Sequence, residues 1–229
     1  MATGMHWEWR GFGEISHALR SRFEALPLAY GAGTPWLDVV DEYLWVPGCR
    51  INVKLRAGIE DGLKLKRLLE TDTAGIELWN EDPDDLFPFS RLDASAFERL
   101  SEALDIRLPA AGPGPWHRAS VLAYLERATP RPRIVVTRKR RQTRRLGQGG
   151  GAILIELAEL SEPERVTSVG LENAVDLAGG ADEQTAAAKA ALLAAIESLE
   201  LTREPLAVTS YLGALEFWSA GRTIAGTTR

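Results

Sequence analysis

The stretch RINVKLRAGIEDGLKLK, residues 50–66, alternates cations and apolar residues on both sides of a turn that contains glycine. Successive side chains of a β-strand point to opposite faces, so this alternation predicts a hairpin with one apolar face. The other face carries Lys54, Arg56, Lys64 and Lys66, with no anion among them. Like charges repel across a strand pair, which favours an anion bound between them. A basic face exposed to solvent is the alternative interpretation.

Composition limits the classes of protein. The 229 residues, 26% charged and 45% hydrophobic, are typical of a folded protein with a large core. A net charge of -5 argues against general nucleic-acid binding, so an anion site has to be a local concentration of Lys and Arg. The single cysteine, Cys49, excludes an internal disulfide and a cysteine-based metal cluster. No signal-peptide core and no apolar run near about 18 residues is present, so we expect a cytoplasmic protein outside the membrane.

The hairpin belongs to a longer series of predicted elements. Alternation and β-branched or aromatic residues predict further strands at 6–10, 37–46, 75–79, 133–146, 152–160 and 165–173. Apolar spacing predicts helices at 14–26, 92–104, 115–127 and 182–199 and a short one within 209–218. We expect Pro115 at the first position of its helix, Asp182 as a helix cap and Ser210 near a helix start. We expect one domain over 1–220 and a flexible C-terminal tail over 221–229.

Most of these eight strands carry ionisable groups on one phase and apolar groups on the other. A barrel with an apolar interior does not accommodate this pattern. A barrel closed around a wet, charged lumen accommodates it, provided that helices cover the apolar side chains on the outer face. The sequence therefore predicts an α+β fold, an antiparallel eight-stranded closed tunnel barrel with flanking helices.

The order of the motifs resembles the CYTH superfamily, the triphosphate tunnel metalloenzymes. HWEWR at 6–10 is similar to a degenerate form of the amino-terminal Glu-x-Glu-x-Lys motif of that family, with His6 in place of the first Glu and Arg10 in place of Lys. The other matching motifs, in order, are DEY at 41–43, NVKLR at 52–56, GLKLK at 62–66, TRKRRQ at 137–142, SVGLEN at 168–173 and TSYL at 209–212.

The resemblance implies a tunnel in which cations hold triphosphate oxygens and carboxylates hold Mg²⁺ or Mn²⁺, while a water activated by the metal attacks the terminal phosphorus. The phosphate ligands carried over are Arg10, Lys54, Arg56, Lys64, Lys66, Lys139 and Arg141. The metal ligands carried over are Glu8, Glu156 and Glu172, with Glu77 as a further candidate. The catalytic residues carried over are Glu8, Lys66 and Glu172.

His6 departs from the family pattern. One carboxylate fewer is expected to weaken Mg²⁺ binding, because Mg²⁺ prefers oxygen, whereas imidazole suits softer metals such as Mn²⁺ better. We interpret His6 as a tunnel residue that makes a hydrogen bond, with a substitute metal ligand or base as the alternative.

The leading hypothesis is a metal-dependent triphosphatase for a triphosphate-containing small molecule or inorganic polyphosphate. The alternative is a non-catalytic CYTH-like protein that binds an anionic phosphate metabolite. The sequence leaves open whether the protein forms a homodimer. RNA binding through the cations at 138–145 is a third hypothesis. Alternation sends Lys139 and Arg141 inward, however, and we favour pairing of the outward arginines with acidic helices.

Overall fold

The computed structural model describes residues 4–29, 36–56, 62–81, 86–112, 114–148, 151–175 and 181–224. The strands are β1 (Met5–Gly13), β2 (Leu37–Trp45), β3 (Ile51–Arg56), β4 (Gly62–Thr71), β5 (Glu77–Asn80), β6 (Leu86–Pro88), β7 (Arg133–Leu146), β8 (Ile153–Glu162), β9 (Val166–Ala174) and β10 (Leu206–Val208). The α-helices are α1 (His17–Ala25), α2 (Ala94–Leu104), α3 (Arg118–Leu125), α4 (Ala181–Ser198) and α5 (Tyr211–Ser219).

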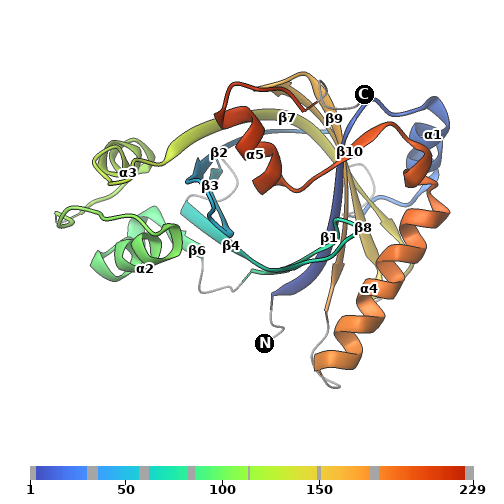
Figure 1. Cartoon of the computed structure of the whole chain (residues 1–229), viewed down its shortest axis with the longest axis horizontal. Helices are drawn as coiled ribbons and strands as arrows, with labels where there is room; N and C mark the ends of the chain where they lie inside the picture. Colours follow the sequence, from blue (N-terminus) through green and yellow to red (C-terminus); the bar gives the residue numbers. More distant parts are fainter. Residues whose placement is uncertain are drawn as a thin grey trace.

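Eight of these strands close into an antiparallel barrel (Figure 1). Their order is β1-β5-β4-β3-β2-β7-β8-β9, and β9 pairs with β1 to complete the ring. β6 pairs with β4 and β10 pairs with the end of β1, so these two short strands extend the sheet outside the ring. The predicted fold class, a closed eight-stranded antiparallel barrel with flanking helices, is confirmed.

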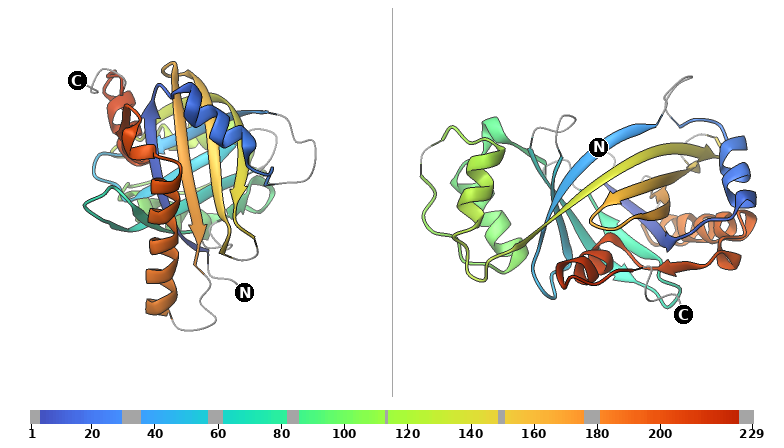
Figure 2. Two further views of the ribbon diagram at one scale, coloured as in Figure 1. Left: turned by 90° about the vertical axis from the view of Figure 1, so that its right-hand side faces the viewer. Right: turned by 90° about the horizontal axis from the view of Figure 1, so that it is seen from above.

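Helices cover the apolar outer face of the barrel on two opposite sides (Figure 2). The apolar positions of the hairpin 50–66, such as Val53 and Leu65, pack against α2 and α3 through Phe97 and Leu125. On the other side, β1, β8 and β9 pack against α1 and α4. The outward-facing side chains of the strands therefore form the main core, and the inward-facing side chains line the lumen.

The lumen has two chemically different halves. Near one end, inward-facing aromatic and aliphatic residues such as Phe12, Trp79 and Val135 pack around Tyr211 and Trp218 of α5. Phe12 lies edge-on to both of these α5 rings, with centroid distances of 5.6 and 5.7 Å. We call this part the apolar half and the remainder the charged half. The prediction of a charged lumen therefore describes only part of the interior, because α5 fills one end.

Several predicted boundaries are wrong. Pro115 is not the first residue of its helix: α3 begins at Arg118, and the His117 side chain caps it by accepting from the backbone N–H of Ser120 at 3.2 Å. Asp182 lies inside the first turn of α4 and is not its cap. Ser210 lies at a helix start as expected, and it also caps α5, since its hydroxyl accepts from the N–H of Gly213 at 3.2 Å.

The chain also stays packed beyond the predicted start of the tail. Ile224 is buried, and its backbone N–H donates to Glu164 Oε2 at 2.8 Å. The remaining tail residues, 225–229, lie outside the described part of the chain. None of the described helices combines the length and apolarity needed to cross a membrane.

Candidate functional site

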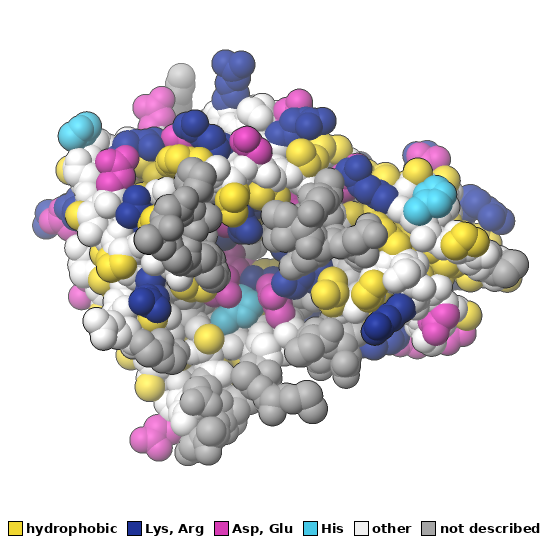
Figure 3. Space-filling model, turned by 180° about the vertical axis from the view of Figure 1, so that it is seen from behind, with side chains coloured by type: hydrophobic (Ala, Val, Ile, Leu, Met, Phe, Trp, Pro, Cys, Tyr) yellow, Lys and Arg dark blue, Asp and Glu magenta, His cyan; other side chains and the backbone are white. Residues whose placement is uncertain are grey.

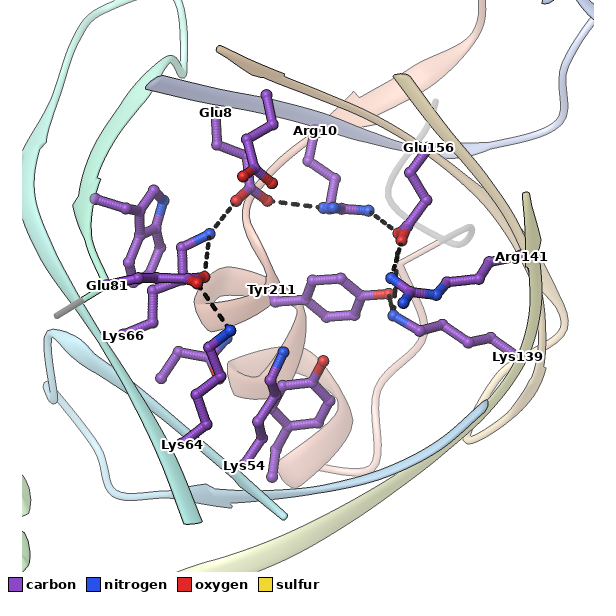
Figure 4. A pocket seen from close by; sticks show the side chains of 14 residues that line it. Glu8, Arg10, Lys54, Lys64, Lys66, Glu81, Lys139, Arg141, Glu156 and Tyr211 are labelled. Atoms are coloured by element: carbon purple, nitrogen blue, oxygen red, sulfur yellow. Dashed lines mark hydrogen bonds and ion pairs between the residues drawn. The ribbon is translucent and has the colours of Figure 1, made fainter. Parts of the chain in front are cut away.

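A cavity of about 100 Å³ lies in the charged half of the lumen (Figure 4). Seen from the face opposite α5, the molecule is hollowed where Lys, Arg, Asp and Glu side chains gather (Figure 3). The charged residues that line the cavity are Arg10, Lys54, Lys64, Lys66, Lys139, Arg141, Glu8, Glu81, Glu156 and Glu172. These six cations and four carboxylates, counted over the described side chains, leave a formal net charge of +2. An anion is therefore favoured inside.

Glu8 is the centre of a row of glutamates that crosses paired strands. In the sheet register, Glu8 is directly opposite Glu77 of β5 and Glu172 of β9. Glu8 accepts hydrogen bonds from Arg10 Nε at 3.0 Å and from Lys66 Nζ. Burial alone would raise the pKa of Glu8, but the charges of Lys66 and Arg10 outweigh it and hold the pKa well below its ordinary value. Glu8 is therefore ionised.

Glu77 has a different environment although it belongs to the same row. It is buried and accepts a hydrogen bond from Trp79 Nε1 at 3.0 Å. Burial, together with the negative charge of Glu8, raises the pKa of Glu77 to about 7. Glu77 does not line the cavity.

Arg10 and Glu156 meet across the surface of β9. Both are in register with Gly170, where an added Cβ would lie 2.6 Å from Arg10 Nη2, so the glycine makes room for the guanidinium. Arg10 Nη1 donates to Glu156 Oε1 at 3.1 Å, and Arg141 Nη1 donates to Glu156 Oε2 at 2.7 Å. Burial would raise the pKa of Glu156, but Lys139, Arg10 and Arg141 lower it further than burial raises it. Glu156 thus holds two guanidinium groups in fixed positions.

Tyr211 of α5 forms the floor of the cavity (Figure 4). Lys139 Nζ donates to its hydroxyl at 3.0 Å and lies 3.7 Å from Asp41 Oδ2. The Arg10 guanidinium lies 4.6 Å from the centre of the Tyr211 ring. The helix that plugs the apolar half therefore also positions two of the cations.

The hairpin supplies the opposite wall. Lys54 of β3 is directly opposite Lys64 of β4, and both line the cavity. Lys64 Nζ lies 2.9 Å from Glu81 Oε2, and Lys66 Nζ lies 3.6 Å from Glu81 Oε1. Burial would raise the pKa of Glu81, but the lysine charges lower it to about 2. Lys66 thus stands between two carboxylates, Glu8 and Glu81.

His6 lies beside the row of glutamates. Its Nε2 is 3.8 Å from Glu8 Oε2 and 3.9 Å from Glu172 Oε1. These three ligand atoms lie within 4.8 Å of one another and could hold a metal ion. Nδ1 faces the carbonyl oxygen of Gly4 at 3.4 Å, whereas Nε2 is buried without a hydrogen-bond partner in the described part of the chain. The interpretation of His6 as a hydrogen-bonding residue thus accounts for only one of its two nitrogens.

Most residues proposed from the sequence come together here. The cavity collects Glu8, Arg10, Lys54, Lys64, Lys66, Lys139, Arg141, Glu156 and Glu172. The side chain of Arg56 lies outside the described part of the structure, although its backbone pairs with Asp41. Glu156 is not in the group with metal-binding spacing, because it faces Arg10 and Arg141. The roles of all these residues remain predictions.

Two further residues that line the cavity, Glu81 and Tyr211, are not among the predicted site residues. Glu81 continues the alternation of Glu77 and Trp79, and that alternation would have placed it inside. Tyr211 lies in the TSYL motif, but its position beneath the cations depends on where α5 packs.

Two of the outward arginines at 138–145, Arg138 and Arg140, pair with a neighbouring strand and not with acidic helices as we expected. Arg138 Nε donates to Glu162 Oε2 at 2.9 Å, and Arg140 Nη2 donates to Glu159 Oε2 at 2.7 Å. Both acceptors belong to the neighbouring strand β8. The β7–β8 ladder pairs Arg138 with Glu162 and Arg140 with Glu159, with a register shift after Arg138, so each arginine has its acceptor directly opposite on the next strand.

No protein-family model matches this chain, and no curated protein sequence matches it. Among solved structures it is similar to a conserved hypothetical protein from Pyrococcus furiosus, with 14% identity, a TM-score of 0.38 and coverage of 81% of this chain and 90% of that chain. It is also similar to a protein from Bacillus halodurans provisionally assigned as an adenylate cyclase, with 10% identity, a TM-score of 0.36 and coverage of 86% and 91%. At these TM-scores neither likeness bears on what this chain does.

The fold and the cavity define a closed barrel with an ionic lumen. Fixed guanidinium groups and lysines face a carboxylate row across a narrow space. Such a site is suited to an elongated anion with several charges, and its carboxylates are suited to a divalent cation.

Proposed function

We propose that this protein binds a triphosphate or short polyphosphate together with a divalent cation in the charged half of the lumen, and hydrolyses its terminal phosphoanhydride bond. One observation carries the proposal. Among the described residues, Arg141 Nε is a buried donor without an acceptor, on a residue that lines a cavity whose described side chains carry a formal net charge of +2. A buried donor left unsatisfied is costly, so an anionic oxygen at this position would relieve both the missing hydrogen bond and the excess charge.

The dimensions of the cavity favour the phosphate chain as the part that enters. Pockets for drug-sized organic ligands measure about 300–1,000 Å³. This cavity, at about 100 Å³, is smaller. A nucleoside or other organic group would therefore remain at the open end, and inorganic triphosphate is the simplest substrate.

We assign different roles to the side chains that line the cavity. We assign phosphate binding to Arg10, Lys54, Lys64, Lys66, Lys139 and Arg141, and metal binding to Glu8 and Glu172. Glu156 keeps Arg10 and Arg141 oriented, because each donates to one of its oxygens. A divalent cation held by Glu8 and Glu172 would neutralise phosphate oxygens and lower the pKa of a coordinated water. Lys66 is placed to neutralise charge near Glu8 as the bond breaks.

The motif order that resembles the CYTH superfamily and the closed eight-stranded barrel both support this proposal. A second candidate is a protein that binds the anion without hydrolysis. His6 favours it, since it replaces a carboxylate at the metal group, and so does Glu8, whose two oxygens both accept from cations.

Phosphate release from inorganic triphosphate and ATP, with Mg²⁺, Mn²⁺, Co²⁺ or EDTA, tests the proposal. We expect release that requires metal and falls by about 100-fold or more in Glu172→Gln, as loss of a metal-positioning group does. Glu162→Gln, at the exposed end of β8, is the control and should keep full activity. No release with any metal, while triphosphate still raises the melting temperature, would refute hydrolysis and leave the binding protein.

A further inference from the structure

The group formed by His6, Glu8 and Glu172 has the frame of a metal centre. His6 and Glu8 alternate on β1, so they face the same side of the strand. Glu172 is directly opposite Glu8 on β9, at the seam that closes the barrel. The three ligand atoms therefore come from adjacent paired backbone positions and lie within 4.8 Å of one another.

His6 is oriented as a metal ligand would be. The residue is only 4% exposed, and its Nδ1 faces the carbonyl of Gly4, which favours a proton on Nδ1. The lone pair of Nε2 then faces two carboxylates at 3.8 and 3.9 Å and has no hydrogen-bond partner among the residues that the structure describes. A lone pair surrounded by anions is unfavourable unless a cation lies between them.

The donor set discriminates between metals. Mg²⁺ takes oxygen ligands in near-ideal octahedral geometry, and an imidazole nitrogen is a poor member of such a set. Zn²⁺ and Co²⁺ accept imidazole and carboxylate together, with Zn²⁺ bonds of about 2.0–2.2 Å that place tetrahedral ligands roughly 3.4 Å apart. The two distances from His6 Nε2, 3.8 and 3.9 Å, exceed that value by about 0.4–0.5 Å, and all three ligand atoms lie within 4.8 Å of one another.

We propose that His6, Glu8 and Glu172 form a transition-metal site that selects Zn²⁺ or Co²⁺ over Mg²⁺. The inference rests on the metal requirement of the proposed function, but it concerns binding and is tested by binding. His6 is the residue that determines the selection, since a carboxylate at the same position would complete an all-oxygen set.

The ion pairs around Glu8 allow a metal ion to bind at this site. Glu8 Oε2 accepts from Lys66, and a metal on this oxygen would displace that ammonium. Lys66 has a second carboxylate, Glu81, with an Oε1 oxygen 3.6 Å away. The displaced lysine thus keeps an ion pair, and the metal does not leave a buried cation without a partner.

Metal titrations of untagged, EDTA-treated protein test the inference. We expect Co²⁺ to develop visible absorption bands and calorimetry to show Zn²⁺ binding about 100-fold or more tighter than Mg²⁺. His6→Gln should abolish the Co²⁺ bands and weaken Zn²⁺ binding by about 100-fold or more. His6→Glu should shift the preference toward Mg²⁺. His17→Gln, at an exposed histidine on α1, is the matched control and should bind like the wild type.

Unchanged Co²⁺ bands and Zn²⁺ affinity in His6→Gln, or equal binding of Mg²⁺ and Zn²⁺, would overturn the inference. Absence of Co²⁺ binding to the wild type would also overturn it and leave a proton alone between the carboxylates. Circular dichroism checks folding. If His6→Gln does not fold, Glu172→Gln decides, because that side chain is 45% exposed and its loss should weaken Zn²⁺ binding without unfolding the barrel. Zn²⁺ binding without phosphate release would refute the proposed hydrolysis and leave this inference standing.

Discussion

The two halves of the lumen share the inward-facing side chains of β1, β7, β8 and β9, yet they differ in chemistry. On β1, Glu8 and Arg10 face the ionic cavity, and Phe12, at the next inward position, packs against α5. The apolar half is filled by α5, and its contacts are made within the protein. The charged half keeps a cavity with excess positive charge. Strand alternation thus selects which residues face inward, and the element that covers the barrel end decides whether they form core or site.

Phe12→Ala tests the apolar half and is expected to have the largest effect. Phe12 is fully buried and contacts both Tyr211 and Trp218, so truncation should lower the free energy of unfolding by about 3–5 kcal/mol. Chemical denaturation measures the change. Triphosphate should stabilise the wild type and this variant equally, so the difference between them should remain. Leu193→Ala, at a residue 41% exposed on α4, should change stability by about 0.5 kcal/mol or less. Equal effects of the two variants would show that α5 is not a core element.

Glu156→Gln tests the charged half. The amide keeps one acceptor oxygen where Arg10 and Arg141 now have two, and it removes their shared negative charge, so we expect a loss of about 3 kcal/mol. Here triphosphate should restore stability, because it supplies the missing negative charge. Thermal unfolding with and without triphosphate measures both effects.

Glu159→Gln is the matched control on the same strand. Glu159 also accepts from two arginines, Arg20 and Arg140, but its side chain is 32% exposed, so the loss should be about 1 kcal/mol or less. A Glu156→Gln protein as stable as the wild type, with no gain from triphosphate, would contradict the assignment of Glu156 as an organising counter-ion.

Glu77→Gln tests whether Glu77, unlike Glu8, holds a proton in the folded protein near neutral pH. Burial raises the folded-state pKa of Glu77 from 4.5 to about 7. Between these values the folded state holds a proton that the unfolded state releases, so this group makes the free energy of unfolding fall as pH rises through the window. The free energy of unfolding of the variant, relative to that of the wild type, should therefore rise from pH 5 to pH 8, by at most about 3 kcal/mol.

Urea denaturation of both proteins at several pH values, in EDTA, measures this difference. Glu98→Gln, on the exposed side of α2, is the control. A constant difference between wild type and Glu77→Gln across the window would mean that Glu77 is ionised in the folded protein, like Glu8. The row of glutamates would then carry no proton on Glu77.

Local alternation made much of the barrel predictable. The hairpin at 50–66 has Val53 and Leu65 outside and Lys54 and Lys64 inside, as the sequence indicates. The eight strands of the ring and the inward phase that carries Glu8, Arg10 and Lys139 follow from the same period of two. These features depend on side-chain direction along one strand, which neighbouring residues in the sequence determine.

The partners of these residues depended on the tertiary structure. The register at the β1–β9 seam brings Glu172 opposite Glu8, and Gly170 lets Arg10 reach Glu156. The packing of α5 places Tyr211 under the cations and makes one half of the lumen apolar. The sequence by itself determined that the barrel would have a charged inner phase. Only barrel closure and helix docking decided which charges meet, because those contacts join segments far apart in the chain.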